Sequence, residues 1–251
     1  MDPQDSTLTA AQPITAGDLT IKVFADGADI EHIKMLAANP LIKGFTTNPT
    51  LMAKVGITDY EMFARRVLEV VTELPISFEV FSDDLPEIER QALKIAAWGE
   101  NVYVKIPVTN TKGERLEALL RSLVDQGVKV NVTGLMTLAQ VERVAEAVAG
   151  ETPSNISVFA GRIADTGSDP IPIMAQALEI MADAAPNSEL IWASPRELLN
   201  LVQADGIGCH IITVTHDVLK KLPLLGKDHE QYSLETVQMF FNDAVSVGYT
   251  L

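Results

Sequence analysis

The sequence holds a single cysteine, Cys209, among its 251 residues. Because a disulfide joins two cysteines and structural zinc sites combine several Cys or His ligands, one cysteine excludes an internal disulfide and every multi-cysteine metal site. Its neighbours include no basic side chain placed to activate the thiol, so we interpret Cys209 as a packing residue. The four histidines show no ligand-like spacing with acidic residues. The sequence therefore predicts no bound metal, and the scarcity of cysteine is typical of a reducing compartment.

Long apolar runs and positive charge are also scarce. No stretch reaches the roughly 20 apolar residues that a membrane-spanning helix needs. The first residues lack the basic and then apolar pattern of a secretory signal. Lys and Arg number 19 against 34 Asp and Glu, which gives a formal net charge of -15. Because such a charge repels nucleic acids and anionic membranes, we expect the protein to bind neither. The lack of a membrane span and of a secretory signal predicts a cytoplasmic protein.

The glycine motifs of nucleotide-binding folds are missing too: no Gly-x-Gly-x-x-Gly follows the first strand, and no Walker-type Gly-Lys-Ser/Thr is present. From Ile21 onward the sequence instead repeats a unit of a short strand-like run, a turn and an amphipathic stretch. The strand-like runs cover residues 21–26, 42–47, 76–81, 102–107, 128–133, 156–160, 190–194 and 211–215. The helical stretches between them cover residues 30–38, 60–74, 86–98, 115–126, 138–149, 172–184 and 195–204.

Strands that alternate with helices in this way predict an α/β protein, a (β/α)8 TIM barrel, and a doubly wound parallel sheet is the alternative. We expect residues 1–20 to form a flexible lead-in. Residues 21–251 are predicted to form a single barrel domain. That domain includes an additional C-terminal helix over residues 234–247, which follows a linker at residues 222–228.

Lys105 stands late in the apolar, β-branched run at residues 102–107, whereas the lysines of other strand-like runs precede their apolar residues. In a parallel barrel this places Lys105 toward the C-terminal strand ends, where active sites gather. A buried ammonium is costly unless it is paired or loses its proton, and the free amine is a nucleophile. These features are typical of a Schiff-base lysine. The alternative is that Lys105 extends into solvent at the strand end.

Most strand-like runs carry apolar residues at one parity and polar residues at the other. Because alternate side chains of a strand face opposite sides, we predict that the polar set faces the barrel lumen. A lysine, two carboxylates, an amide and hydroxyls that face one another are a costly core unless they form a site. The predicted luminal set is Phe24, Asp26, Ser77, Glu79, Phe81, Lys105, Lys129, Asn131, Thr133, Ser157, Phe159, Trp192 and Ser194.

Several members of this set, and the nearby Asn48, have a purely structural alternative. A short polar side chain after a strand often caps a helix or shapes a turn, and buried polar groups pair with one another. In chain order, the alternatives are that Asp26 is an N-cap or turn residue for the helix after the first strand, that Asn48 shapes the turn before Pro49, that Glu79 only neutralises Lys105, and that Asn131 and Thr133 bond each other.

Two arginines differ from the rest because they follow strand ends instead of lying in helical patterns. Arg162 follows the sixth strand-like run, and Arg196 follows the seventh, two positions after Ser194. Two guanidinium groups and a hydroxyl on neighbouring loops are predicted to form a phosphate clamp, at a position where barrels commonly bind phosphate. The alternative is that both arginines form surface salt bridges.

Short motifs are spread along the chain, and they are Phe24-Ala25-Asp26, Thr46-Thr47-Asn48-Pro49-Thr50, Val104-Lys105-Ile106-Pro107-Val108-Thr109, Asn131-Val132-Thr133, Phe159-Ala160-Gly161-Arg162-Ile163 and Ala193-Ser194-Pro195-Arg196. With these motifs the chain resembles the transaldolase family, from Ile21 to the C-terminal helix. The resemblance implies an enzyme that transfers a dihydroxyacetone unit from a ketose phosphate to an aldose phosphate, with neither a metal nor an organic cofactor.

The resemblance also implies a role for each site residue. Lys105 forms the Schiff base and Asp26 is the acid/base at the C4 hydroxyl. Glu79 and Thr133 handle protons, through a water, while the carbinolamine forms and dehydrates. The substrate-binding residues that it implies are Asn48, Asn131 and Ser157 around the dihydroxyacetone moiety, Phe159 in the same site, and Arg162, Ser194 and Arg196 around the phosphate.

The same family contains fructose-6-phosphate aldolases, which release dihydroxyacetone and carry Tyr and Gln where this chain has Phe159 and Glu79. Both residues are of the transferase type here, which favours transaldolase over aldolase. A sugar-phosphate-binding barrel without catalysis is a remote alternative, because it would not need Lys105, Asp26 and Glu79 together. The chain departs from the family pattern at Pro195, where an aromatic residue is usual. The implied partners are small-molecule sugar phosphates and further copies of the chain in a homo-oligomer, and the implied pathway is the pentose phosphate pathway.

Overall fold

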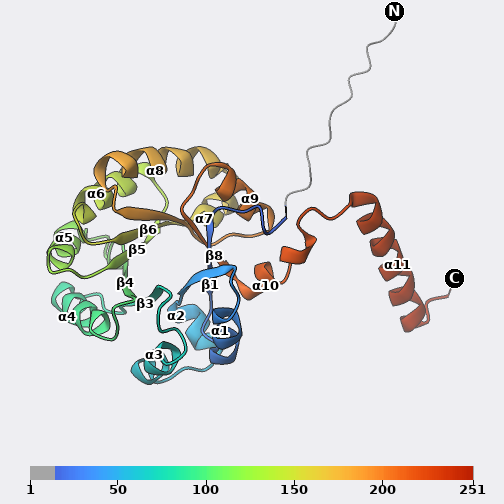
Figure 1. The fold of residues 1–251 in the computed structure, drawn as a ribbon, viewed down its shortest axis with the longest axis horizontal. Helices are drawn as coiled ribbons and strands as arrows, with labels where there is room; N and C mark the ends of the chain where they lie inside the picture. The colour runs from blue at the N-terminus through green and yellow to red at the C-terminus, as the bar shows by residue number, and fades with distance from the viewer. Residues whose placement is uncertain (1–14, 251) are drawn as a thin grey trace, which may run out of the picture. The chain divides into compact units, whose positions relative to one another are not determined.

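The computed structural model describes residues 15–250, so the first fourteen residues of the predicted lead-in lie outside the described residues. Eight parallel strands close into a barrel in sequential order, with helices around it (Figure 1). The predicted (β/α)8 TIM barrel is confirmed, and the alternative of an open doubly wound sheet is wrong. The strands are β1 (Lys22–Asp26), β2 (Ile42–Thr46), β3 (Ile76–Glu79), β4 (Val102–Pro107), β5 (Val130–Leu135), β6 (Ser154–Val158), β7 (Ser188–Trp192) and β8 (Ile211–Thr215).

The helices of the barrel follow the predicted stretches, with three additional short helices. These short helices, α2, α7 and α10, begin within three residues of a strand end and are too brief to show a helical period in sequence. The helices are α1 (Ile30–Ala37), α2 (Pro49–Lys54), α3 (Tyr60–Leu68), α4 (Leu85–Ala96), α5 (Glu117–Asp125), α6 (Leu138–Val148), α7 (Ala160–Asp165), α8 (Ile171–Ala184), α9 (Leu199–Gly206) and α10 (His216–Leu219).

Aspartate caps begin three of these helices. The carboxylate of Asp29 accepts a hydrogen bond from the backbone nitrogen of His32 at 2.9 Å, which satisfies an exposed donor of the first turn of α1. Asp59 and Asp84 cap α3 and α4 in the same way. Because Asp29 occupies the cap of α1, the alternative that Asp26 caps this helix is wrong.

Part of the lumen is filled by apolar side chains. Phe24, Ile191, Ala193 and Ile211 form a buried cluster, and Phe159 packs against it. Gly44 makes room for this packing, because a Cβ atom at that position would lie 2.5 Å from the Phe24 ring.

One predicted strand parity is wrong. The prediction placed Trp192 and Ser194 in the lumen, but Ile191 and Ala193 join the luminal cluster, and Trp192 is fully buried at the opposite parity. Register explains this result, since Ile191 pairs with Ser157 of β6 and with Ile211 of β8. Ser194 lies beyond the end of β7 with φ 60, in the left-handed region, so strand alternation no longer governs its direction.

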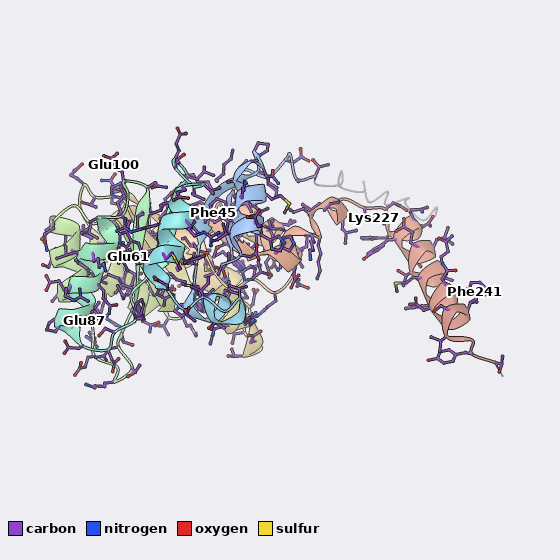
Figure 2. The ribbon with its side chains drawn as sticks, turned by 90° about the horizontal axis from the view of Figure 1, so that it is seen from below. Phe45, Glu61, Glu87, Glu100, Lys227 and Phe241 are labelled. Atoms are coloured by element: carbon purple, nitrogen blue, oxygen red, sulfur yellow. The ribbon has the colours of Figure 1, made fainter. Side chains whose placement is uncertain are left out.

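The chain divides into two compact units, the barrel unit Thr20–Leu219 and a second unit that contains the segment from Lys220 onward. In this segment, η1 (Leu222–Leu224) precedes α11 (His229–Val247), which Asp228 caps and Gly248 ends at φ 75. The predicted C-terminal helix is therefore present, and Figure 2 labels Phe241 on it. Its inclusion in one domain with the barrel stays a prediction. Within residues 15–250, no helix combines the length and apolar character needed to cross a bilayer.

Candidate active site

A cavity of about 600 Å³ lies at the C-terminal ends of the strands. Its position follows from its lining, because Asp26, Thr46, Glu79 and Pro107 are the last residues of the first four strands. All of the predicted site residues except Asn131 line it. They are Asp26, Asn48, Glu79, Lys105, Thr133, Ser157, Phe159, Arg162, Ser194 and Arg196.

Lys105 is buried in β4, with an exposed fraction of 7%. The alternative that it extends into solvent is therefore wrong. Its Nζ donates a hydrogen bond to the carbonyl oxygen of Thr47 at 3.0 Å and lies 3.2 Å from Oε2 of Glu79. Lys105 and Glu79 both line the cavity, so the amine is held toward it.

Glu79 is the direct register partner of Lys105 across the β3–β4 pair. Its side chain is 15% exposed, and its carboxylate neutralises the Lys105 ammonium in a site with little solvent. The predicted neutralising contact is thus confirmed. This contact also leaves a carboxylate oxygen within reach of the amine proton, so it does not exclude a catalytic role.

Asp26 is half-buried at the end of β1 and accepts three hydrogen bonds. Thr46 Oγ1 donates to its Oδ1 at 2.8 Å, and Asn48 Nδ2 donates to Oδ2 at 3.1 Å and to Oδ1 at 3.4 Å. Burial raises the pKa of Asp26 above its ordinary value, and the charge of Lys105 and the bonds from Thr46 and Asn48 oppose that rise. The environment therefore favours a carboxyl group that can exchange a proton nearer to neutral pH.

Asn48 serves two elements at once. Its Oδ1 accepts from the backbone nitrogen of Leu51 at 2.9 Å, which caps α2, and Pro49 occupies the first position of that helix. The structural alternative for Asn48 is therefore confirmed. Its amide nitrogen is left to bond Asp26, so the cap also orients the side chain toward the cavity.

Asn131 does not line the cavity and is fully buried in β5, where it is the register partner of Lys105. Its Nδ2 donates to Ser77 Oγ at 2.9 Å, and its Oδ1 accepts from Ser157 Oγ at 2.7 Å. The alternative that Asn131 bonds Thr133 is wrong. Within the described residues, the buried Thr133 hydroxyl makes no hydrogen bond, although Thr133 lines the cavity. Asn131 thus fixes the Ser157 hydroxyl, while the Thr133 hydroxyl keeps its bonding capacity for a group in the cavity.

Two threonines of the site were not assigned a role from sequence. The hydroxyl oxygens of Thr46 and Thr213 lie 2.5 Å apart, and the Thr46 hydroxyl donates a hydrogen bond to Asp26. The two threonines and Asp26 thus form a series of hydrogen bonds. Thr213 is buried in β8 and lines the cavity. Applying the parity rule to β8 would have identified it, because Ile211, Thr213 and Thr215 share one side of that strand.

The arginine end of the cavity is built from α7 and the segment before α9. Arg162 lies in α7, not in a loop as predicted, and its guanidinium lies over the Phe159 ring at 5.5 Å. Arg196 precedes α9, and the side chain pairs with Asp165 at the end of α7. Arg196 thus forms the predicted surface salt bridge while it also lines the cavity. The bonds from Arg196 hold the pKa of Asp165 below its ordinary value.

Gly161 sets how closely these two segments approach. A Cβ atom at Gly161 would lie 1.5 Å from the carbonyl oxygen of Ser194, so no other residue fits there without backbone movement. The backbone nitrogen of Gly161 also donates to the carbonyl oxygen of Ala193 at 3.3 Å. This approach brings Ser194 and Arg196 to the same end of the cavity as Arg162.

The cavity therefore combines a buried primary amine, a carboxylate 3.2 Å from it, a second carboxylate and two guanidinium groups at one end. An amine attacks carbonyl carbons, a carboxyl group with a raised pKa transfers protons, and arginines bind phosphate. Among residues 15–250, no group of three His, Cys, Asp or Glu side chains is arranged to hold a metal ion.

Comparison with protein families identifies one matching model, described as Transaldolase/Fructose-6-phosphate aldolase, over residues 23–250. A protein named probable transaldolase from Dehalococcoides mccartyi is 35% identical over 202 residues, which cover 80% of this chain and 90% of the relative. One of the same name from Exiguobacterium is 32% identical over 215 residues, covering 84% and 95%. Probable transaldolase 2 of Listeria monocytogenes is 33% identical over 215 residues, covering 84% and 94%.

Comparison with solved structures gives a crystal structure of a putative lyase/mutase from Burkholderia cenocepacia J2315. The two chains superpose with a TM-score of 0.56 over 81% of this chain and 79% of the other. Their sequence identity is 13%, so this likeness concerns the fold alone.

Proposed function

Because this chain belongs to the transaldolase/fructose-6-phosphate aldolase family, we propose that it is a transaldolase that works through a Schiff base on Lys105. It takes a dihydroxyacetone unit from fructose 6-phosphate or sedoheptulose 7-phosphate. It gives that unit to erythrose 4-phosphate or glyceraldehyde 3-phosphate. The observation that carries the proposal is the buried Lys105 amine, 3.2 Å from Glu79 in a cavity that also holds Asp26 and two arginines.

The first step joins Lys105 to the ketose. Lys105 must give up a proton before its amine attacks the C2 carbonyl, and Glu79 is the carboxylate beside it that accepts this proton. Loss of water from the carbinolamine then needs a proton on the leaving hydroxyl. Glu79 returns that proton, with the Thr133 hydroxyl as a donor and acceptor in the same cavity. The product is an iminium ion that accepts electrons from the adjacent carbon.

The second step cleaves the C3–C4 bond. Asp26 removes the proton from the C4 hydroxyl, the C4 oxygen forms a carbonyl, and the electron pair of the broken bond moves into the iminium to give an enamine. The aldose phosphate leaves. The raised pKa of Asp26 supports this role, because a base must later release the same proton as an acid when the enamine attacks the new aldehyde.

The phosphate of donor and acceptor binds at the arginine end of the cavity. Arg162 and Arg196 supply positive charge and Ser194 a hydroxyl donor, all on the cavity wall. Binding there sets the distance of the reacting carbon from Lys105, which is how a remote group contributes to the chemical step. Asn48 bonds the Asp26 carboxylate, and Ser157, held by Asn131, orients the dihydroxyacetone moiety.

Two residues favour transfer over release of dihydroxyacetone. Phe159 packs against the apolar cluster under Arg162 and brings no hydroxyl group to the cavity, so it cannot donate a proton to the enamine. Glu79 is of the transferase type as well. Fructose-6-phosphate aldolase is the alternative, and a non-catalytic sugar-phosphate-binding barrel is a remote one. A place in pentose phosphate metabolism, in the cytoplasm and as a homo-oligomer, belongs to the same proposal.

A product assay tests the reaction. The purified protein is incubated with fructose 6-phosphate, with and without erythrose 4-phosphate, and the products are separated. The proposal expects sedoheptulose 7-phosphate and glyceraldehyde 3-phosphate when the acceptor is present, and little dihydroxyacetone without it. Free dihydroxyacetone at a comparable rate without acceptor would identify an aldolase instead.

A further inference from the structure

Asp165 is an acidic residue at the positively charged end of the cavity. It ends α7, three residues after Arg162, and the side chain faces Arg196 across the gap to the segment before α9. Arg196 donates from Nε to Oδ1 at 3.0 Å and from Nη2 to Oδ2. The contact is thus bidentate, with two parallel bonds in the arrangement that gives arginine–carboxylate pairs their directional preference.

The bidentate contact uses one edge of the guanidinium group. An arginine side chain has further N–H donors, on Nη1 and on the free side of Nη2, and these remain for a second anion. Arg196 lines the cavity, whereas Asp165 is absent from its wall. The carboxylate therefore bonds one edge of the guanidinium from outside the cavity, and the remaining donors are left for a group inside it.

The backbone around this pair is fixed at a second point. Gly161, at the start of α7, approaches the carbonyl oxygen of Ser194 too closely for any side chain, and its nitrogen bonds Ala193. On the other side, the backbone nitrogen of Arg196 donates to Asn200 Oδ1 at 2.8 Å. The main chain of both segments is thus held at Gly161 and Asn200. The Arg196 side chain, with several rotatable bonds, is held by Asp165.

We propose that Asp165 is a positioning residue that holds the Arg196 guanidinium in the orientation that binds the substrate phosphate. This inference rests on the proposed function, in which Arg162, Ser194 and Arg196 bind that phosphate. Asp165 touches no reacting atom and acts through Arg196. Without it, Arg196 keeps its charge and loses its fixed orientation, and each binding event then has to order the side chain.

Two other interpretations give different results. The side chains of Arg196 and Asp165 are 48% and 52% exposed, and an exposed pair of this kind contributes little to stability. If the pair were only a surface contact, its loss would leave phosphate binding unchanged. If Asp165 mainly competed with phosphate for Arg196, its loss would tighten phosphate binding.

The test replaces Asp165 by Ala and measures steady-state kinetics with fructose 6-phosphate and erythrose 4-phosphate. Ordering one released side chain corresponds to an increase of ~2–10-fold in KM for the phosphorylated substrates, with kcat little changed. Affinity for inorganic phosphate, measured by titration calorimetry, should fall by the same factor. Asp165→Asn keeps one acceptor oxygen for Nε and should give an intermediate KM. Asp183→Ala, which removes an exposed carboxylate from α8, is the charge-matched control and should change neither quantity.

Unchanged or tighter phosphate binding by Asp165→Ala would overturn the proposal, because both outcomes show that the contact does not orient Arg196 for phosphate. Trapping of unphosphorylated dihydroxyacetone on Lys105 with borohydride separates this result from a failure of the proposed function. The Asp165→Ala variant should trap dihydroxyacetone as the unaltered protein does. If the unaltered protein traps none, the Schiff-base function itself is wrong, and the calorimetric titration still decides the role of Asp165.

Discussion

Lys105 and Glu79 are direct register partners on adjacent strands, and their charged atoms lie 3.2 Å apart on the wall of the cavity. This pairing serves both the stability of the fold and the proposed chemistry. Burial of a lone ammonium is costly, and the carboxylate removes that cost. Catalysis needs the amine without its proton, and the same carboxylate is the nearest group to take it.

Glu79→Gln tests whether Glu79 accepts the proton of Lys105. Glutamine keeps the size of the side chain but cannot accept the Lys105 proton, so formation and dehydration of the carbinolamine should slow. Fructose-6-phosphate aldolases of the same family carry Gln at this position, so the variant should keep measurable Schiff-base formation while kcat for transfer falls, by up to the ~100-fold that a general acid/base contributes. Stopped-flow measurement of Schiff-base formation should show that this step has become slow. A variant that forms the Schiff base at an unaltered rate would exclude Glu79 as the proton acceptor.

Thr46→Val should change the pH dependence of the reaction. The Thr46 hydroxyl bonds Asp26 at 2.8 Å and lowers the pKa of Asp26, against the larger raising effect of burial. Its removal leaves burial less opposed, so the pKa of Asp26 rises further. Because Asp26 acts as the base in its ionised form, the acidic limb of the kcat/KM profile should move to higher pH. A limb that stays in place or moves to lower pH contradicts the assignment.

Thr213→Val should produce a smaller shift in the same direction. Thr46 gives its single hydroxyl proton to Asp26, so Thr213 must donate to Thr46 across their 2.5 Å contact. Loss of that donor weakens the Thr46–Asp26 bond without removing it. The two variants are compared by fitting the same limb of the kcat/KM profile. A Thr213 effect larger than that of Thr46→Val would show that Thr213 does not act through Thr46.

Asp26→Asn should abolish transfer and at the same time stabilise the fold. The folded-state pKa of Asp26 is raised, so the folded protein binds more protons than the unfolded chain and stability falls as pH rises through that pKa. Asparagine removes this loss. The gain in the free energy of unfolding should therefore be greatest at neutral pH and vanish in acid, where Asp26 is protonated in both states.

Asp29→Asn is the matched control for this stability measurement. Asp29 is a cap residue of α1, and asparagine preserves the acceptor oxygen of the cap. The control should therefore show no comparable pH-dependent gain. Urea titrations of the three proteins between acid and neutral pH measure the difference. A destabilised Asp26→Asn variant at neutral pH would contradict the burial argument.

Gly161→Ala should damage the fold locally and phosphate binding with it. The new Cβ atom would lie 1.5 Å from the Ser194 carbonyl oxygen, and relief of such a clash costs about 1–3 kcal/mol or more. Gly206→Ala is the control, because that position lies in α9 with nothing within 4 Å of the added atom. Thermal unfolding should show a lower midpoint for the first variant only. Equal midpoints would mean that the close approach is not required.

The sequence predicted the barrel because strands alternate with helices along the chain. It predicted most of the cavity wall because side chains alternate between the two faces of each strand. Lys105 was identified because it follows its apolar run, and alternation then pointed to Glu79 and Thr133. Alternation fails where a strand has ended. Ser194 lies beyond the end of β7, and its left-handed backbone, not strand alternation, directs its side chain to the cavity. Extending the alternation to Ser194 therefore assigned the wrong side of β7 to the lumen.

Two other features could not be predicted from alternation along the strands. One depends on buried hydrogen-bond partners, and the other lies in a helix too short to show a helical period in the sequence. Asn131 has the predicted luminal parity but does not line the cavity, because its amide group bonds Ser77 and Ser157, and parity does not predict these partners. Asp165 lies in α7, a helix of six residues, and its pairing with Arg196 depends on how closely Gly161 brings two separate segments together. Such an approach is a property of tertiary packing, and no local pattern around Asp165 indicates it.

Covalent trapping on Lys105 tests the central claim most directly. The protein is incubated with fructose 6-phosphate, reduced with borohydride, digested, and mapped by mass spectrometry, with Lys105→Ala as the control. The account predicts a dihydroxyacetone-sized adduct on the peptide that contains Lys105, and neither adduct nor transfer in the folded Lys105→Ala protein. Transfer at a near wild-type rate by Lys105→Ala, or an adduct on another lysine alone, would contradict it.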